Sequence, residues 1–329
     1  FNIYLIKKMR NKDFKRRRDS LVRKIEDNSV VFLFSGLEKS RNNDVNYKFR
    51  QSSNFFYLTG INNPSMILII TKISNQHTTT LVCDRPNDID KIWHGQLPSK
   101  SFYKNEFEIQ NVLYSDEFNS FELNDAKNMY FEFADENRLN QFIEDLNLSQ
   151  PQSRYLRNNT SRSTKIDLSN ILFDMRRIKS KSEVSLIRHA AKISANAHIN
   201  IMKSCKSGLK EYEIEADFIK HCMSERCEQA YPAIVASGKN ACVLHYTKNN
   251  STLRSNSLLL VDAAAEYDNY ASDITRTIPV SGKFNEFQKK IYEIVLKAQT
   301  MAIKACKPGK TLIDAVSYTH LTLPTSTHG

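Results

Sequence analysis

The chain has 329 residues, of which 40% are apolar and 25% are charged. This composition is typical of a globular protein and excludes a disordered, collagenous or coiled-coil chain. The length allows about two domains, each large enough to bury a core. No apolar run approaches the ~20 residues that a membrane-spanning helix needs, so we expect a soluble protein without a membrane partner.

The positive charge is concentrated at the start of the chain. Residues 1–24 hold ten basic and two acidic residues, and so carry +8 of the net charge of +11. Apolar side chains recur there at helical spacing, at Phe14, Leu21 and Ile25, which predicts an amphipathic helix. We expect its basic residues to form a solvated face rather than a nucleic-acid-binding arm. Because Met9 directly precedes this helix, we expect natural translation to start there.

The cysteines indicate a reducing environment. The six cysteines include no C-x-x-C pair, and no secretory signal precedes them. Free thiols are therefore expected rather than a disulfide framework or a metal cluster. This favours the cytoplasm, and the arginine-rich start leaves a mitochondrial location as the alternative.

The first part of the chain alternates strand-like and helical patterns. Short continuous apolar runs, of the length expected for buried strands, lie at residues 30–34, 66–71, 79–83 and 129–133. Helical spacing follows at residues 138–146. We expect an α/β domain over residues 9–150, followed by a polar linker over residues 151–168 that contains Pro151 and is rich in Ser, Asn, Gln and Arg.

The second part begins with helices and continues with strands. Ser180 and Glu183 have the spacing of an N-terminal capping box, and the helical pattern that follows stops at Gly208. A second helix is predicted over residues 211–227. Three strands are predicted over residues 233–236, 257–263 and 271–280. We assign residues 169–316 to a second, α+β domain.

The last residues differ in character from the rest. Residues 317–329 contain no Lys, Arg, Asp or Glu and are nearly half Ser and Thr. They resemble translated vector sequence, so we expect them to be non-native and the natural chain to continue differently after Val316.

Two aspartates are the strongest candidates for chemistry. Asp262 ends an apolar strand, and Asp273 opens the next strand after a polar turn. A hairpin can bring both carboxylates to one point, where they repel each other unless a cation or a proton lies between them. Hard divalent ions prefer such oxygen ligands. The spacing alone supports a second interpretation at least as well as a metal site, in which Asp262 caps a turn and Asp273 is a surface residue.

The segment around these aspartates resembles a known family. Residues 261–284 are similar to the metal-site signature of aminopeptidase P (Xaa-Pro aminopeptidase), a pita-bread metallopeptidase. Further segments resemble the same family in the same order, at residues 14–18, 49–60, 92–95, 176–183, 230–246 and 291–296. The resemblance implies a creatinase-N type (aminopeptidase P N-terminal) α/β domain followed by an incomplete α+β pita-bread domain.

The resemblance also implies an activity and a metal site. Members of this family remove the N-terminal residue that precedes a proline, and they use two divalent ions, usually Mn²⁺, held by two Asp, one His and two Glu. Asp262 and Asp273 match the two Asp, and Asp273 would bridge both ions. A metal-bound water, deprotonated near neutral pH, would attack the scissile carbonyl while the metals stabilise the oxyanion.

Two further residues match family positions. His245 matches a substrate-side histidine that hydrogen-bonds near the scissile peptide; without the resemblance, a packed core histidine would be the usual interpretation. Trp93 matches a tryptophan that, in bacterial relatives, borders the active site of a neighbouring subunit, which implies a homo-oligomer. A packing role for Trp93 inside the first domain is the alternative. The sequence departs from the family at Ala264, where glycine is common.

The ligand set is incomplete in this sequence. The resemblance implies one His and two Glu ligands downstream of the aspartates, and the His and Glu residues after Thr277 are Glu286, Glu293, His320 and His328. Neither glutamate lies in a segment that matches a ligand position, and both histidines lie in the tail. We therefore expect the natural gene product to be an Xaa-Pro aminopeptidase, and this chain by itself to be inactive and poorly stable.

Other functions on the same fold stay open. One is an Xaa-Pro dipeptidase. Another is a non-catalytic pita-bread protein that binds a partner, although such relatives lose the metal ligands, whereas Asp262, Asp273 and His245 are present here. A metal-free creatinase-type amidinohydrolase is disfavoured by the two aspartates.

Overall fold

The computed structural model of the protein describes residues 9, 11–86, 91–92, 95, 98–118, 126–149 and 163–314, with the backbone alone at 146–149. The chain forms two compact units. The first comprises the residues up to Ile187 together with Asp268–Tyr270, and the second comprises Arg188–Tyr267 and the residues from Ala271 onward. In this described part of the chain, no helix is both long and apolar enough to cross a membrane.

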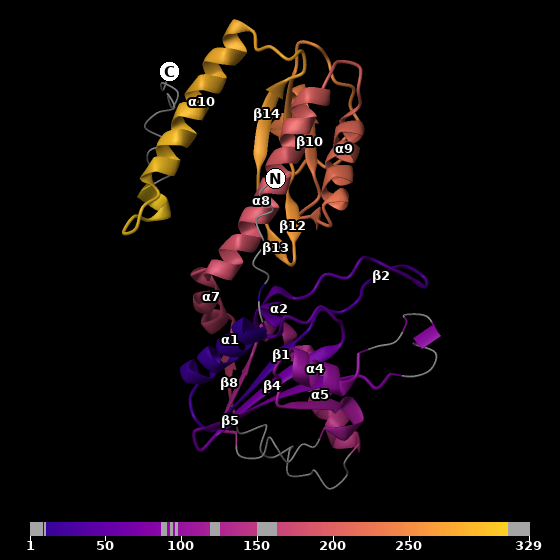
Figure 1. The fold of residues 1–329 in the computed structure, drawn as a ribbon, viewed down its shortest axis with the longest axis vertical. Coiled ribbons are helices and arrows are strands. Elements are labelled where there is room, and N and C mark those ends of the chain that lie inside the picture. Colours follow the sequence, from indigo (N-terminus) through magenta and orange to yellow (C-terminus); the bar gives the residue numbers. More distant parts are fainter. Residues whose placement is uncertain are drawn as a thin grey trace. The chain divides into compact units, whose positions relative to one another are not determined.

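The first unit is built on a six-stranded mixed sheet (Figure 1). Its strands, in spatial order, are β6 (Asn111–Tyr114), β5 (Gln76–Cys83), β4 (Met66–Ile73), β1 (Ser29–Phe34), β7 (Asn128–Phe131) and β8 (Thr164–Asp167). β4 pairs antiparallel with β1 and β5, and the other neighbours are parallel. The four apolar runs predicted as strands form the middle of this sheet. A separate hairpin joins β2 (Ser40–Asn42) and β3 (Val45–Asn46).

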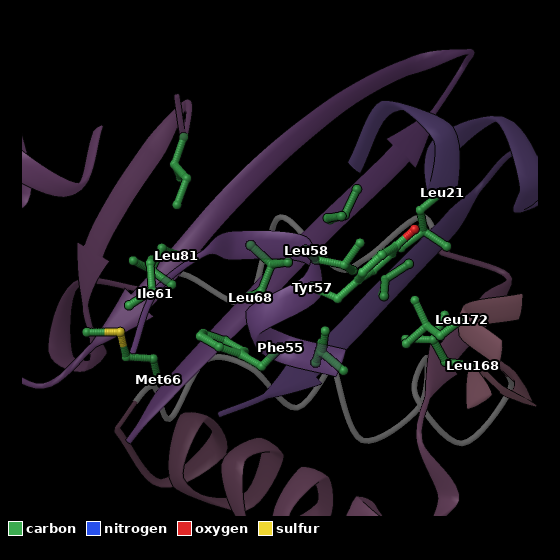
Figure 2. Packing of buried hydrophobic residues seen from close by; sticks show 14 of the residues in the cluster. Leu21, Phe55, Tyr57, Leu58, Ile61, Met66, Leu68, Leu81, Leu168 and Leu172 are labelled. Carbon is green, nitrogen blue, oxygen red and sulfur yellow. The ribbon is translucent and has the colours of Figure 1, made fainter. Parts of the chain in front are cut away.

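Strand β1 is buried on both faces, which explains its continuous apolar sequence. Val31 and Leu33 belong to the larger core, and Phe32 belongs to a second core on the opposite face of the sheet. Helices α1 (Asn11–Lys24), α2 (Ser53–Thr59), α4 (Lys100–Glu106) and α7 (Ser169–Arg177) contribute to the larger core, and α5 (Glu136–Ser149) contributes to the second. Figure 2 shows Leu21 of α1 and Phe55 of α2 in the larger core.

The basic face of α1 is only partly solvated, which corrects the expectation from the sequence. Arg17 and Arg18 are 7% and 2% exposed. Arg17 pairs with the buried carboxylate of Glu183 at 3.1 Å. Arg18 donates at 2.8–2.9 Å to the backbone carbonyls of Leu58, Phe107 and Glu108. A periodicity argument misses these two arginines because their partners are distant in sequence.

The end of the predicted linker belongs to the first unit. Strand β8 pairs with β7 at the sheet edge, and Leu168 and Leu172 are fully buried in the larger core (Figure 2). Helix α7, which the sequence analysis assigned to the second domain, therefore packs in the first. Most of the linker, residues 151–162, lies outside the described residues, so the linker itself stays a prediction.

The second unit packs helices against two small sheets. One sheet has the antiparallel order β10 (Ile234–Ser237), β11 (Leu258–Asp262) and β14 (Thr275–Pro279), and the other has the order β13 (Tyr270–Ala271), β12 (Ala265–Tyr267) and β9 (Glu228–Gln229). Helices α8 (Lys181–Ser204) and α9 (Glu211–Ser224) supply Ile193 and Phe218 to a core shared with Val235 and Val261. Helix α10 (Glu286–Ala305) follows, with Ala298 as its buried residue.

Two expectations about the part of the chain from residue 180 onward have clear outcomes. The capping box is confirmed, because the amide of Ser180 donates to the Glu183 carboxylate at 2.7 Å and the amide of Glu183 donates to Ser180 Oγ at 3.3 Å. The third predicted strand is instead split into β13 and β14. The backbone turns between them because Ser272 donates from both its amide and its hydroxyl to the carbonyl of Ala265, each at 3.0 Å.

We predict that Arg18→Met destabilises the first unit by about 3 kcal/mol, because one buried and two half-buried backbone carbonyls lose their charged donor. Burial already lowers the pKa of Arg18 to about 10, yet the group stays protonated at neutral pH. Urea unfolding followed by circular dichroism measures the change. Arg23→Met, at an exposed position of the same helix, is the control and should change stability by less than about 0.5 kcal/mol. Equal effects of the two substitutions would contradict the prediction.

Candidate functional site

Asp262 and Asp273 are brought together by one tyrosine. Asp262 is the last residue of β11, and Asp273 lies two residues before β14. The hydroxyl of Tyr231, which precedes β10, lies 2.6 Å from Oδ1 of Asp262 and 3.1 Å from Oδ1 of Asp273. A hydroxyl has one proton to donate, so it donates to one carboxylate at a time. The two carboxylates therefore converge on a single point.

This arrangement concentrates negative charge. Burial, followed by the hydrogen bond to Asp262 and the charges of both aspartates, raises the pKa of Tyr231 well above its ordinary value. The phenol is consequently neutral at physiological pH and can serve as a donor. Asp262 is half-buried and Asp273 is exposed. Two converging carboxylates with open access can accept a hard divalent cation, which would relieve their repulsion.

Backbone pairing fixes the two aspartates relative to each other. In the β11–β14 register, Asp262 faces Thr275, and just beyond it the amide of Ala263 donates to the carbonyl of Ile274 at 3.2 Å. The carboxylates therefore sit on neighbouring segments of one ladder. Ala264 is fully buried and its φ lies outside the left-handed region, so the methyl group that replaces the family's glycine causes no backbone strain.

Helix α8 supports this ladder through two buried polar side chains. Nε2 of His198 lies 2.9 Å from the carbonyl of Ala263, and since a carbonyl only accepts, Nε2 carries the proton. Burial lowers the pKa of His198, so the ring is neutral and needs no counter-charge. Ser194 Oγ accepts from the amide of Ala265 and lies 2.8 Å from Ser272 Oγ. The turns on both sides of the aspartates are thereby tied to the helix.

His245 lies apart from these contacts. It sits in a turn after the short 3₁₀ helix η4 (Gly238–Cys242), and its side chain is exposed. The segment that carries it is anchored from α9. Glu211, the fully buried first residue of α9, accepts five hydrogen bonds of 2.7–3.1 Å. The donors are the amide and hydroxyl of Ser237, Asn240 Nδ2, the hydroxyl of Tyr246 and the amide of Ser251.

The remaining candidates do not join this site. Glu286 and Glu293 are exposed on α10, where Oε1 of Glu293 lies 3.8 Å from Nζ of Lys289. Trp93, His320 and His328 lie outside the described residues, so their proposed roles stay predictions. Among the residues that the structure describes, no group of three or more His, Cys, Asp or Glu side chains gathers in a metal-binding cluster. The described oxygen donors at the site are thus the two carboxylates and the Tyr231 hydroxyl.

The chain matches known proteins along most of its length. Residues 14–130 match the aminopeptidase P N-terminal domain, and residues 185–322 match metallopeptidase family M24. The Xaa-Pro aminopeptidase of Escherichia coli is 32% identical over 92% of this chain and 69% of its own length, and that of Haemophilus influenzae is 35% identical over 94% and 70%. The chain belongs to the aminopeptidase P family. Membership in a metallopeptidase family implies dependence on a divalent metal ion.

Solved structures agree with this assignment. Proline aminopeptidase P II from Yersinia pestis superposes with a TM-score of 0.89 at 30% identity, covering 95% of this chain and 73% of that chain. Aminopeptidase P from Escherichia coli with the inhibitor Pro-Leu gives a TM-score of 0.88 at 29% identity. The fold expected from the sequence, an aminopeptidase P N-terminal domain and an incomplete pita-bread domain, is confirmed. The M24 match reaches residue 322 and so includes the first residues of the segment predicted to be non-native, which stays a prediction.

Sequence reasoning missed the polar residues that hold the site together. Tyr231 lies inside a segment that resembles the family, but nothing in its spacing from Asp262 and Asp273 predicts a shared hydrogen bond. His198 lies within the helix predicted after Ser180, where no pattern predicts its partner, and the structure shows its side chain buried beneath the ladder. Glu211 carries a weak signal, because a glutamate at the first position of a helix also suits the helix dipole.

We predict that Glu211 makes the stability of the second unit depend on acid pH. Burial by itself would raise the pKa of Glu211, but the hydrogen bonds from Ser237, Ser251 and Tyr246 outweigh it and lower the pKa below the ordinary 4.5. A lowered folded-state pKa stabilises the protein above the unfolded-state value, and this contribution is lost as the pH falls through the folded-state value. Glu211→Gln removes it.

The measurement is the difference in free energy of unfolding between wild type and Glu211→Gln. We expect about 2 kcal/mol at pH 7 and a smaller difference at pH 3. Glu225→Gln, at an exposed position at the end of α9, is the control and should show little difference at either pH. A difference for Glu211→Gln that is constant with pH would contradict the assignment.

Proposed function

We propose that this protein removes the N-terminal residue from peptides with proline in second position, in a metal-dependent reaction. The observation that carries this proposal is the convergence of Asp262 and Asp273 on one hydroxyl, within the segment that matches the metallopeptidase family. Relatives named Xaa-Pro aminopeptidase, with at least 32% identity over most of this chain, support the substrate class. Peptides that begin Xaa-Pro are therefore the proposed substrates.

The donor set fits a hard divalent cation, and we assign Asp262 and Asp273 as its ligands. Two carboxylates with a supporting phenol are oxygen donors of the kind that Mn²⁺ and Mg²⁺ prefer. We propose that the site holds two Mn²⁺ ions, because the resemblance to the family implies this number and this metal. When bound, such ions lower the pKa of a coordinated water and polarise the scissile carbonyl. Tyr231 orients the carboxylates by donating to them, and the β11–β14 ladder holds their separation.

His245 is proposed to contact the substrate. Its exposed position in an anchored segment leaves the imidazole available to hydrogen-bond near a peptide bond. Trp93 is proposed, from the resemblance alone, to border the active site of a neighbouring subunit. Self-association is proposed on the same ground. A cytoplasmic location is proposed because the sequence has no C-x-x-C pair that would indicate a metal site or a redox motif.

A non-catalytic binding role is less well supported than catalysis. Proteins that lose the reaction have no need to keep two carboxylates converging on one half-buried donor, because that arrangement costs electrostatic free energy when nothing neutralises it. An Xaa-Pro dipeptidase would use the same two aspartates, and the length of the peptide accepted is what separates it from an aminopeptidase.

We predict that the chain binds Mn²⁺ weakly, with a Kd on the order of 10⁻³ M, because two carboxylates supply few ligands. Asp273→Asn should abolish this binding, and Tyr231→Phe should weaken it about tenfold or more, since it removes the donor that orients both ligands. Electron paramagnetic resonance of free Mn²⁺ measures both effects.

The matched controls lie nearby. Asp268→Asn changes an exposed aspartate of the β12–β13 turn, and Tyr212→Phe changes an exposed tyrosine of α9; neither should alter binding. Mn²⁺ binding that survives Asp273→Asn would remove this aspartate from the site.

We predict that the 329-residue chain, purified alone, releases no N-terminal residue from an Xaa-Pro tripeptide above the rate without protein. The reason is the ligand count, since a bimetal centre needs more donors than the described residues bring together. Chromatography of the products with and without Mn²⁺ measures this. Mn²⁺-dependent release would show that other residues of the chain complete the site.

A further inference from the structure

A buried carboxylate ties together both ends of the segment that carries His245. Glu211 is 0% exposed. Its Oε1 accepts from the amide and hydroxyl of Ser237, each at 2.7 Å, and from Asn240 at 3.1 Å. Its Oε2 accepts from the hydroxyl of Tyr246 at 2.7 Å and from the amide of Ser251 at 2.9 Å. One side chain thus contacts the beginning, the middle and the end of residues 237–251.

The five hydrogen bonds select a carboxylate over an amide at position 211. All five donors are uncharged, and together they point five hydrogen atoms at two oxygens. Only a carboxylate can accept all of them, because an amide of the same shape replaces one acceptor by a donor. A buried charge without such donors would be costly. The donors therefore require Glu211 in its ionised form, and Glu211 requires this conformation of the segment.

Tyr246 links this network directly to His245. Its hydroxyl donates to Glu211 and accepts from Asn240 Nδ2 at 3.0 Å, so the residue next to His245 is held by two half-buried hydrogen bonds. Further along, the buried side chain of Asn249 donates to the carbonyl of Ala233 at 2.9 Å and accepts from the amide of Val235 at 3.0 Å. Asn249 is thus an independent anchor, and we expect it to keep the segment attached when Glu211 is replaced.

We propose that Glu211 is a positioning residue for the reaction, because it fixes residues 238–250 in one conformation and thereby sets the place of His245. The inference rests on the proposed function for the role of His245 at the substrate. It assigns to a carboxylate at the start of α9 the task of orienting a group that it does not itself touch. The contacts that carry it all lie within the second unit.

The substitution Glu211→Gln tests the positioning role of Glu211, because it keeps the shape of the side chain and replaces one acceptor oxygen by a donor. Three donors gather at Oε1 and two at Oε2, so the Gln oxygen should take the Ser237 side and turn its NH₂ toward Tyr246 and Ser251. The Tyr246 hydroxyl can rotate to accept, whereas the Ser251 amide is left without an acceptor. Tyr246→Phe is the second variant. It removes one donor, leaves Glu211 charged, and releases the residue adjacent to His245.

Two measurements on the whole metal-free chain report the result. Hydrogen exchange with mass spectrometry should show amides of residues 238–251 exchanging about tenfold faster or more in Glu211→Gln. Histidine ring NMR, with the His245 signal assigned through His245→Asn, should show that signal shifted or split in both variants. The signal of His198, in the core of the same unit, should stay in place. Glu225→Gln is the control and should move neither readout.

The outcomes are decisive in either direction. A displaced His245 signal beside an unchanged His198 signal supports positioning. A His245 signal that stays in place in a folded variant overturns it, and so does an equal shift of all histidine signals, since that indicates general loosening. If Glu211→Gln fails to fold, the His245 signal of Tyr246→Phe decides between these outcomes. Mn²⁺ binding by the unsubstituted chain separates this proposal from the proposed function. Absence of Mn²⁺ binding would contradict the proposed function, whereas the His245 signal tests only whether Glu211 positions His245.

Discussion

The site depends on the antiparallel ladder between β11 and β14. Asp262 is the last residue of one strand, and Asp273 enters the other through a turn that Ser272 and Ser194 hold in place. If the register slipped by one residue, the carboxylates would leave the shared hydroxyl of Tyr231. The ladder and the tyrosine together allow two like charges to remain close, which is the condition for binding a divalent ion.

The structure stabilises this region with buried polar groups whose hydrogen bonds are satisfied within the protein. His198 is neutral and donates to the Ala263 carbonyl, Ser194 bridges two turns, and Glu211 is satisfied by five neutral donors. Each group satisfies backbone atoms that would otherwise be orphaned at strand ends. Such groups keep loops beside a reactive site in one conformation without filling the site itself. The same solution appears in the first unit, where Arg18 satisfies three carbonyls.

Sequence reasoning succeeded where a local period decides the structure. The run at residues 30–34 was predicted as a strand because it is short and continuously apolar, and the Ser180–Glu183 spacing predicted a capping box that the structure contains. It failed where a partner is distant in the chain. Arg17 and Arg18 were predicted to be solvated because their periodicity says nothing of the carbonyls and the carboxylate that bind them. Helix α7 was assigned to the wrong unit because the polar stretch before it looks like a boundary.

The sequence by itself determined most of the predicted strands and helices, the family and the two aspartates proposed as metal ligands, because strand length, helical period and a long motif are all local properties of the chain. Only the tertiary structure decided that one tyrosine hydroxyl joins Asp262 to Asp273, and that Glu211 holds the segment around His245. These contacts link residues 31, 42 and 35 positions apart. They exist because folded strands and helices bring the groups within hydrogen-bond distance. The spacing of these residues in the sequence does not predict that they come close together.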